Sequence, residues 1–92
     1  MAEYARTESV GTTAETVTAP TRLDNITRLH NLDSANGVWV AVKNGVTAAA
    51  EADECVFIPA GASYYIRALA SYSMIAITAP VKVILDGGQG RS

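Results

Sequence analysis

A chain of 92 residues can build one hydrophobic core, because single cores commonly serve chains of about 50–200 residues. Leu, Ile, Val and Phe together make up 21 of the 92 residues, just above the roughly 20% below which chains tend to be disordered, so we expect a thin core that gains stability from partner subunits. The net charge of −2 and the scattered single basic residues argue against nucleic acid as a partner, since binding to phosphates needs clustered Lys and Arg.

The cysteine content and the apolar stretches indicate in which cellular compartment the protein is assembled and whether it enters a membrane. A secreted domain this small would normally carry several disulfides, whereas Cys55 is the single cysteine, so we expect assembly in a reducing cytosol. The first fifteen residues lack the apolar core of a signal peptide. The longest near-apolar stretch, residues 74–85, is too short for a membrane helix. We therefore expect no membrane partner.

Residues 1–21 differ in composition from the rest of the chain. They contain six threonines and only Val10 and Val17 as residues to bury, too little apolar surface to offset the entropy lost on ordering. One interpretation is a disordered leader. The other, which we favour, is an extended arm that adds a strand to the sheet edge of a neighbouring subunit, with Val10 and Val17 as interface residues.

Residues 22–86 have the pattern of a β domain, in which short apolar runs are separated by turn residues. Asn36-Gly37 predicts a tight hairpin turn with positive φ, and Asn44-Gly45 predicts the end of the following strand. Residues 46–54 are expected to form a loop with at most one helical turn, and residues 87–92 a flexible glycine-rich tail. Strands are expected at 26–32, 38–43, 55–58, 63–69, 73–78 and 81–85. Six or seven short antiparallel strands predict an all-β domain, a small β-sandwich or barrel with an extended N-terminal arm.

Two of these strands, 55–58 and 73–78, are apolar on both faces. A sandwich of this length has one interior, so the surplus faces must be covered by loops, by the arm or by another subunit. We favour another subunit and expect a homo-oligomer, with a trimer favoured.

No catalytic or metal-binding constellation is recognisable. His30 is the single histidine, which permits no His-based metal cluster, and Cys55 lies in an apolar strand where its thiol would be buried and inert. The acidic trio Glu51, Asp53 and Glu54 lacks the glycine of a calcium loop. We expect a protein that is not an enzyme, with no metal and no cofactor.

The aromatic residues are better candidates for function. Tyr64 and Tyr65 are adjacent, so they point to opposite faces of one strand, with Tyr64 expected in the core. Four residues are expected to be exposed in the monomer: Trp39, Tyr65, Arg67 and Tyr72. Trp, Tyr and Arg are the types most enriched among interface hot spots, so we favour a protein interface; core packing and carbohydrate binding are the alternatives.

Three runs, at residues 28–42, 56–64 and 73–79, resemble small virion proteins of tailed bacteriophages. They combine an asparagine-containing turn, a valine-rich strand and the segment Ile58-Pro-Ala-Gly-Ala-Ser63. The resemblance implies a β-sandwich structural protein of the virion, assembled in the host cytoplasm, most consistent with a capsid decoration (cement) protein that binds the major capsid protein or another virion protein. A neck or tail accessory protein and a glycan-binding β-sandwich are the alternatives.

Overall fold

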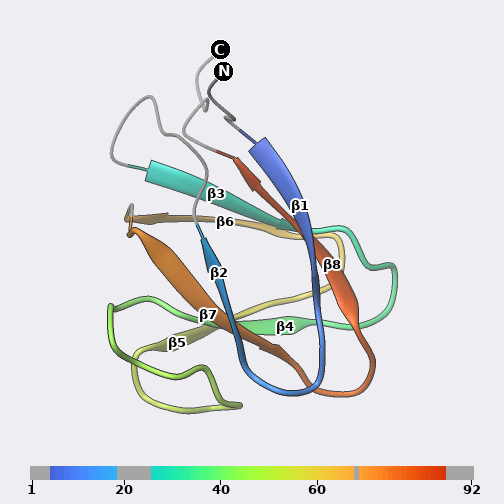
Figure 1. Ribbon diagram of the computed structural model, residues 1–92. Helices are drawn as coiled ribbons and strands as arrows, with labels where there is room; N and C mark the ends of the chain where they lie inside the picture. Colours follow the sequence, from blue (N-terminus) through green and yellow to red (C-terminus); the bar gives the residue numbers. More distant parts are fainter. Residues whose placement is uncertain (1–4, 19–25, 68, 87–92) are drawn as a thin grey trace.

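The computed structural model describes residues 5–18, 26–67 and 69–86, which form strands joined by turns and loops, with no helix among them (Figure 1). The expected all-β class is confirmed. The described strands are β1 (Ala5–Val10), β2 (Glu15–Thr18), β3 (Ile26–Asn31), β4 (Val38–Ala41), β5 (Cys55–Ile58), β6 (Ser63–Arg67), β7 (Ser71–Ala76) and β8 (Val81–Asp86).

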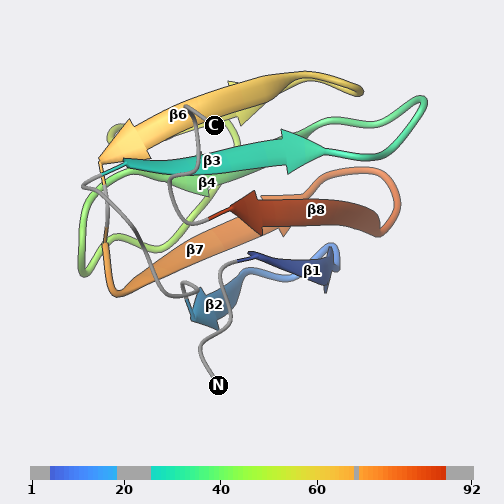
Figure 2. The same ribbon diagram turned by 90° about the horizontal axis from the view of Figure 1, so that it is seen from above.

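The strands form two antiparallel sheets of four strands each. The first sheet has the order β1-β8-β3-β6 and the second the order β2-β7-β4-β5. Each strand of the first half of the chain pairs with its counterpart from the second half: β1 with β8, β2 with β7, β3 with β6 and β4 with β5. The chain is therefore one long hairpin wrapped around a common core, which is the topology of an eight-stranded jelly roll (Figure 2).

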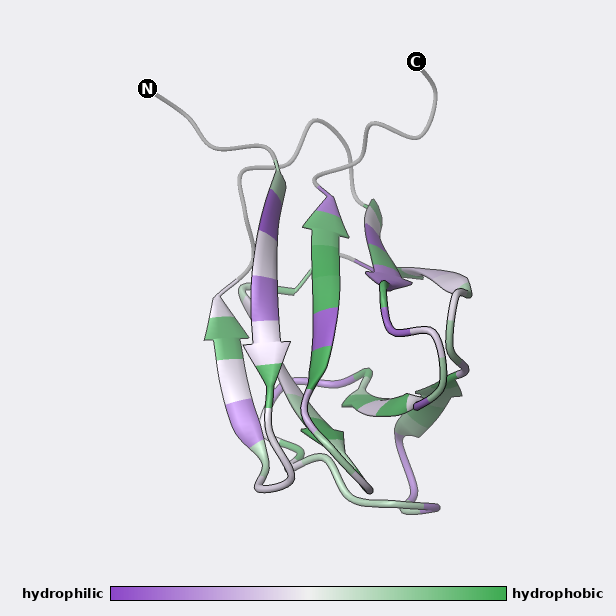
Figure 3. Ribbon diagram, turned by 90° about the vertical axis from the view of Figure 1, so that its right-hand side faces the viewer, coloured by the Kyte–Doolittle hydropathy of each residue, from purple (hydrophilic) through white to green (hydrophobic). Residues whose placement is uncertain are grey.

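The core lies between the two sheets. Alternate residues of each strand point inward, as in β8, where Val81, Val83 and Leu85 are all buried. Figure 3 shows β8, the strand that leads to the C-terminus, as hydrophobic over most of its length. The second sheet contributes Val38, Val40 and Met74, which have no exposed surface. The Cα radius of gyration is 11.9 Å, matching the roughly 12 Å expected for a compact chain of this length.

The N-terminal segment differs from the expected arm, since residues 5–18 form two strands of the domain itself. β1 pairs with β8 and β2 pairs with β7, so the described residues form eight strands where six or seven were expected. Val10 is 0% exposed and Val17 is 5% exposed: both belong to this chain's own core and not to an interface with a neighbour. The sheet edges that the segment needs are supplied within the same chain, so few apolar residues suffice to hold it.

Two contacts secure this segment. The Ala76 N–H donates to the Gly11 carbonyl at 2.9 Å, at the corner where the chain passes from β1 to β2. The Arg6 guanidinium donates to the Thr18 carbonyl at 3.1 Å and so ties β1 to β2 between the sheets. Residues 1–4, 19–25 and 87–92, which include the expected tail, lie outside the described residues.

The connection between β3 and β4 is not the expected hairpin, because β3 belongs to the first sheet and β4 to the second. Neither Asn36 nor Gly37 has a positive φ. The loop is instead shaped by the Asp33 carboxylate, which accepts hydrogen bonds from the N–H groups of Ala35 at 2.9 Å and Asn36 at 2.6 Å. The second glycine turn is as expected, with Gly45 at a φ of 85°.

Candidate interaction surface

Large apolar side chains gather on the outer face of the second sheet. Trp39 of β4 is paired in register with Phe57 of β5 on one side and with Ile75 of β7 on the other. The rings of Trp39 and Phe57 lie 5.1 Å apart between centroids at an interplanar angle of 49°, within the range of favourable aromatic pairs. Trp39 and Ile75 are half-buried, while Phe57 is 46% exposed.

A hollow of about 380 Å³ opens beside these rings. Trp39 and Phe57 line it together with Ile77, which follows β7 and is 50% exposed. Its polar rim includes Asn36 and Thr78. Small-molecule sites typically measure about 300–1,000 Å³, so the hollow has room for one large side chain or one small ring. We call Trp39, Phe57 and Ile77 the aromatic ridge.

Gly37 determines where the Phe57 ring lies. A Cβ atom at this glycine would overlap the Cζ and Cε1 atoms of Phe57 and would lie 3.1 Å from the Ile58 carbonyl oxygen. The ring therefore packs on the backbone of Gly37. The glycine of the Asn36-Gly37 pair serves close packing, and not the positive φ for which the sequence pattern suggested it.

A buried asparagine fixes the rim of the hollow. Asn31 is 0% exposed, and its side-chain amide donates to the carbonyls of Asn36 at 2.9 Å and Ile58 at 3.1 Å. Its carbonyl oxygen accepts the Asp33 N–H at 2.8 Å. The β3–β4 loop is thus bonded to β3 and to the end of β5 before any ligand arrives.

The Asp33 carboxylate holds the same loop electrostatically. The backbone N–H groups of Ala35 and then Asn36 stabilise its charged form and keep the pKa of Asp33 below its ordinary value of 3.8, against a small opposing effect of burial. The β3–β4 loop therefore carries a negative charge at neutral pH, and Glu51 is an acidic residue that lines the hollow itself.

The loop between β4 and β5 covers part of the remaining outer face. Ala41 is 1% exposed and Ala48 is 2% exposed, and the Ala48 N–H donates to the Ser73 hydroxyl at 2.9 Å. One of the surplus apolar faces noted in the sequence is thus partly covered by the chain itself. The aromatic ridge is an apolar portion of this face that stays exposed, with Phe57 at 46% and Ile77 at 50%.

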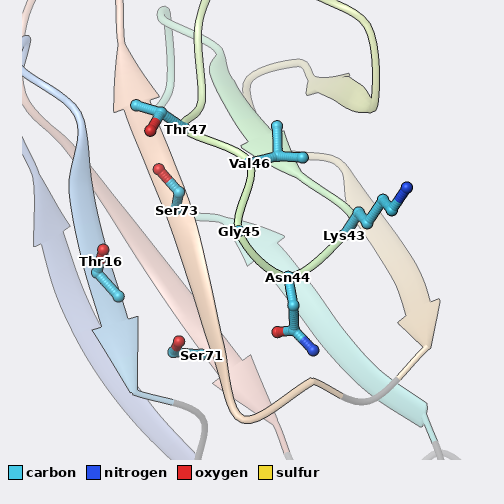
Figure 4. Close-up of a pocket in the computed structure, with 8 residues that line it drawn as sticks. All are labelled: Thr16, Lys43, Asn44, Gly45, Val46, Thr47, Ser71 and Ser73. Atoms are coloured by element: carbon cyan, nitrogen blue, oxygen red, sulfur yellow. The ribbon is translucent and has the colours of Figure 1, made fainter.

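A second, smaller hollow of about 200 Å³ lies on the same sheet (Figure 4). Its strand residues, Thr16, Ser71 and Ser73, offer hydroxyl groups. Lys43 also lines it, but its side chain extends away from these hydroxyls. Ser73 already accepts the Ala48 N–H. Among the residues that line this hollow, no charged side chain points toward the hydroxyl groups. The hollow therefore favours no particular class of ligand.

The outer face of the first sheet is more polar. Tyr65 is 58% exposed and stands in register with Arg28, whose guanidinium lies 3.7 Å from the Asp86 carboxylate. His30 Nδ1 and Ser63 Oγ are 2.7 Å apart. Asp86 on the same face is in register with Arg28.

The residues expected at an interface do not form one surface. Trp39 lies on the outer face of the second sheet, whereas Tyr65 and Arg67 are exposed on β6 of the first sheet. Tyr72 is not exposed as expected: it is 1% exposed, because β7 begins at Ser71 and turns Tyr72 inward. Its hydroxyl donates to the Arg67 carbonyl at 3.1 Å and accepts the Leu69 N–H at 3.0 Å.

Phe57 and Ile77 were missed as candidates. Alternation in residues 55–58 puts Cys55 and Phe57 on one face, but only the register of β5 on β4 shows that this face is outward and beside Trp39.

Tyr64 is inward by register, opposite Leu29, yet 38% exposed, because β6 is the last strand of its sheet.

Comparison with known protein families, with curated proteins and with solved structures finds no match for this chain. Among the described residues, no three His, Cys, Asp or Glu side chains group as metal ligands. No helix within the described ranges could cross a bilayer.

Proposed function

We propose that the chain is a non-enzymatic structural protein of a tailed-phage virion, a capsid decoration protein that binds the major capsid protein or another virion protein through the aromatic ridge. The observation that carries the proposal is the aromatic pair of Trp39 and Phe57, which stands beside a hollow and is continued by the exposed Ile77. Buried aromatic anchors at the centre of an interface supply most of its binding energy. The protein would act in the virion after assembly in the host cytoplasm.

The fold is compatible with this role. Eight-stranded jelly rolls include viral capsid domains, lectins and cupins. Because one fold serves many functions, the surface and the resemblance of the runs at residues 28–42, 56–64 and 73–79 to phage virion proteins carry more of the argument than the topology.

The geometry suits docking of a protein partner. An apolar side chain of the partner would enter the hollow between Trp39 and Ile77, and backbone groups of the partner would meet Asn36 and Thr78 on the rim. Since the amide of Asn31 already holds the loop that carries Asn36, little of the binding energy is lost to ordering it.

Quantitative mass spectrometry of purified phage particles whose genome encodes this chain tests the proposal. A copy number comparable to that of the major capsid protein is expected for a decoration protein. A few copies per particle would indicate a neck or tail accessory protein, and absence from the particle would refute a virion role.

The docking surface is tested separately with Trp39→Ala. Truncation of an anchor typically costs about 2–4 kcal/mol of binding, so the variant, verified as folded by circular dichroism, should bind particles at least about tenfold more weakly. Leu32→Ala is the control, because Leu32 is an exposed apolar residue, at 45%, that does not line the hollow. Equal binding by both variants would refute the aromatic ridge as the docking site.

A glycan-binding module is the second candidate, favoured by the indole of Trp39 at a hollow with a polar rim. Sugars commonly stack on such rings. Saturable quenching of Trp39 fluorescence by a simple sugar, lost in Phe57→Ala, would support this function in place of the structural one.

A further inference from the structure

The two sheets leave four strand edges, and three of them carry features that discourage pairing with another chain. Edge strands are commonly protected by inward-pointing charges, short length or proline. β1 presents Arg6 and Glu8, which lie 3.5 Å apart, from its inner side. β2 has four residues and begins with Glu15, and β5 has four residues and is followed by Pro59.

β6 lacks these features. Its five residues, Ser63–Arg67, contain no proline and no charge before the last position, and four of the five are exposed. Two of them are tyrosines, which are favoured in strands. β6 is therefore the edge of this domain best suited to accept another strand.

Backbone directions show which groups of β6 face outward. The Asn31 N–H donates to the Ala62 carbonyl at 2.9 Å, and successive residues of a strand direct their backbone groups to alternate sides. Tyr64 and Ile66 therefore face β3, whereas Ser63, Tyr65 and Arg67 direct their N–H and C=O groups away from the sheet.

We propose that β6 pairs antiparallel with β6 of a second copy of this chain, about a two-fold axis through Tyr65. The two Tyr65 residues would exchange a pair of hydrogen bonds at the centre, and Ser63 of each copy would exchange a pair with Arg67 of the other. The first sheets of the two copies would join into one continuous sheet. A C2 contact requires such a self-complementary surface.

The side chains fit this arrangement. Each Arg67 would lie opposite an uncharged Ser63, so the two guanidinium groups stand at opposite ends of the contact. The two Tyr65 rings would meet on the outer face, and Tyr64, inward by register but 38% exposed, would gain cover from the second copy. The Arg67 carbonyl already accepts the Tyr72 hydroxyl at 3.1 Å, and its second lone pair remains for the new bond.

Sedimentation velocity across the micromolar range tests the proposal. The wild type should form a dimer, and Tyr65→Lys, which sets two like charges against each other at the axis, should weaken it by at least about tenfold. Thr7→Lys is the matched control, since Thr7 is an exposed outer-face residue of the protected edge β1 and the same charge there should leave dimerisation unchanged.

Cross-linking gives a second readout that does not depend on a destabilising change. In a Cys55→Ser background, Tyr65→Cys should oxidise to a covalent dimer, whereas Thr7→Cys should not. Circular dichroism verifies that each variant is folded. A monomer throughout the range, or an oligomer such as a trimer whose mass and affinity are unaffected by Tyr65→Lys, would overturn the proposal.

Discussion

Gly37→Ala should displace the Phe57 ring from the aromatic ridge without straining the backbone. Gly37 has no positive φ, so an alanine is sterically acceptable to the main chain. The added Cβ would overlap the Phe57 ring and approach the Ile58 carbonyl oxygen to 3.1 Å. Because Phe57 is 46% exposed, its ring can swing toward solvent, and this is the expected response.

The loss of folding stability can be estimated from the contacts that the Phe57 ring gives up. Full burial of a Phe side chain is worth about 1.5–3 kcal/mol, and roughly half of Phe57 is buried, so about 1 kcal/mol of burial is lost. The contact with Trp39 adds about 0.5–1.5 kcal/mol. The total of about 1.5–2.5 kcal/mol corresponds to a decrease in Tm of about 6–20 °C for a domain of this size.

A double-mutant cycle isolates the clash. Unfolding by urea, followed by the fluorescence of Trp39, would give the free energy of unfolding for Gly37→Ala, Phe57→Ala and the double variant. Once the ring is removed, the alanine should cost less than about 0.5 kcal/mol, so the two changes should be strongly non-additive. An equal cost of Gly37→Ala in both backgrounds would refute the role assigned to this glycine.

Three further predictions concern buried or bonded polar groups. Thr27 is 0% exposed, and its hydroxyl has no hydrogen-bond partner among the described residues, so Thr27→Val should raise the free energy of unfolding by about 1–2 kcal/mol; a decrease in a urea titration would show that the hydroxyl is bonded. Asn31→Ala removes the hydrogen bonds donated to the carbonyls of Asn36 and Ile58 and the acceptor for the Asp33 N–H, so it should cost about 2–4 kcal/mol, and a loss below about 1 kcal/mol would contradict the role of Asn31 in fixing the rim. The folded state lowers the pKa of Asp33 below 3.8, so its contribution to stability is complete above that pH and is lost as the pH falls through the folded pKa. The protection factor of the Ala35 amide, which is the intrinsic exchange rate divided by the observed rate, should therefore fall in that window, and Asp33→Asn should abolish this change; the same fall in the variant would exclude Asp33 as its cause.

The β class and most strand positions could be predicted from local pattern. Alternation in residues 38–42 and 81–85 placed Val38, Val40 and Val83 on the inner faces, and the structure agrees. Residues 55–58 form a strand with the expected bounds. These strands could be predicted because alternation of apolar and polar residues shows that one face of a strand is buried, whichever strand lies beside it.

The positions of the N-terminal segment and of Tyr72 could not be read in this way. A segment with two valines looks too polar to order by itself. It is ordered here because β8 pairs with β1 and β7 pairs with β2 in the same chain. Tyr72 was expected to be exposed because the start of β7 was set two residues late, which left Tyr72 outside the strand. In the structure Tyr72 lies two residues before Met74 within β7 and therefore shares its buried face.

The sequence alone thus determined that the chain is all-β and where its valine-rich strands run, whereas it left open whether Trp39 belongs to the core or to an interface. Tertiary structure alone decided the partners of those strands, and with them the surface. Trp39 and Phe57 are 18 positions apart in the chain and meet because β4 and β5 pair in one register. Gly37 and Phe57 come together across a loop that Asn31 bonds to β5. Local composition reports whether a side chain prefers burial, but which side chains adjoin it depends on long-range strand pairing, and no local pattern encodes that pairing.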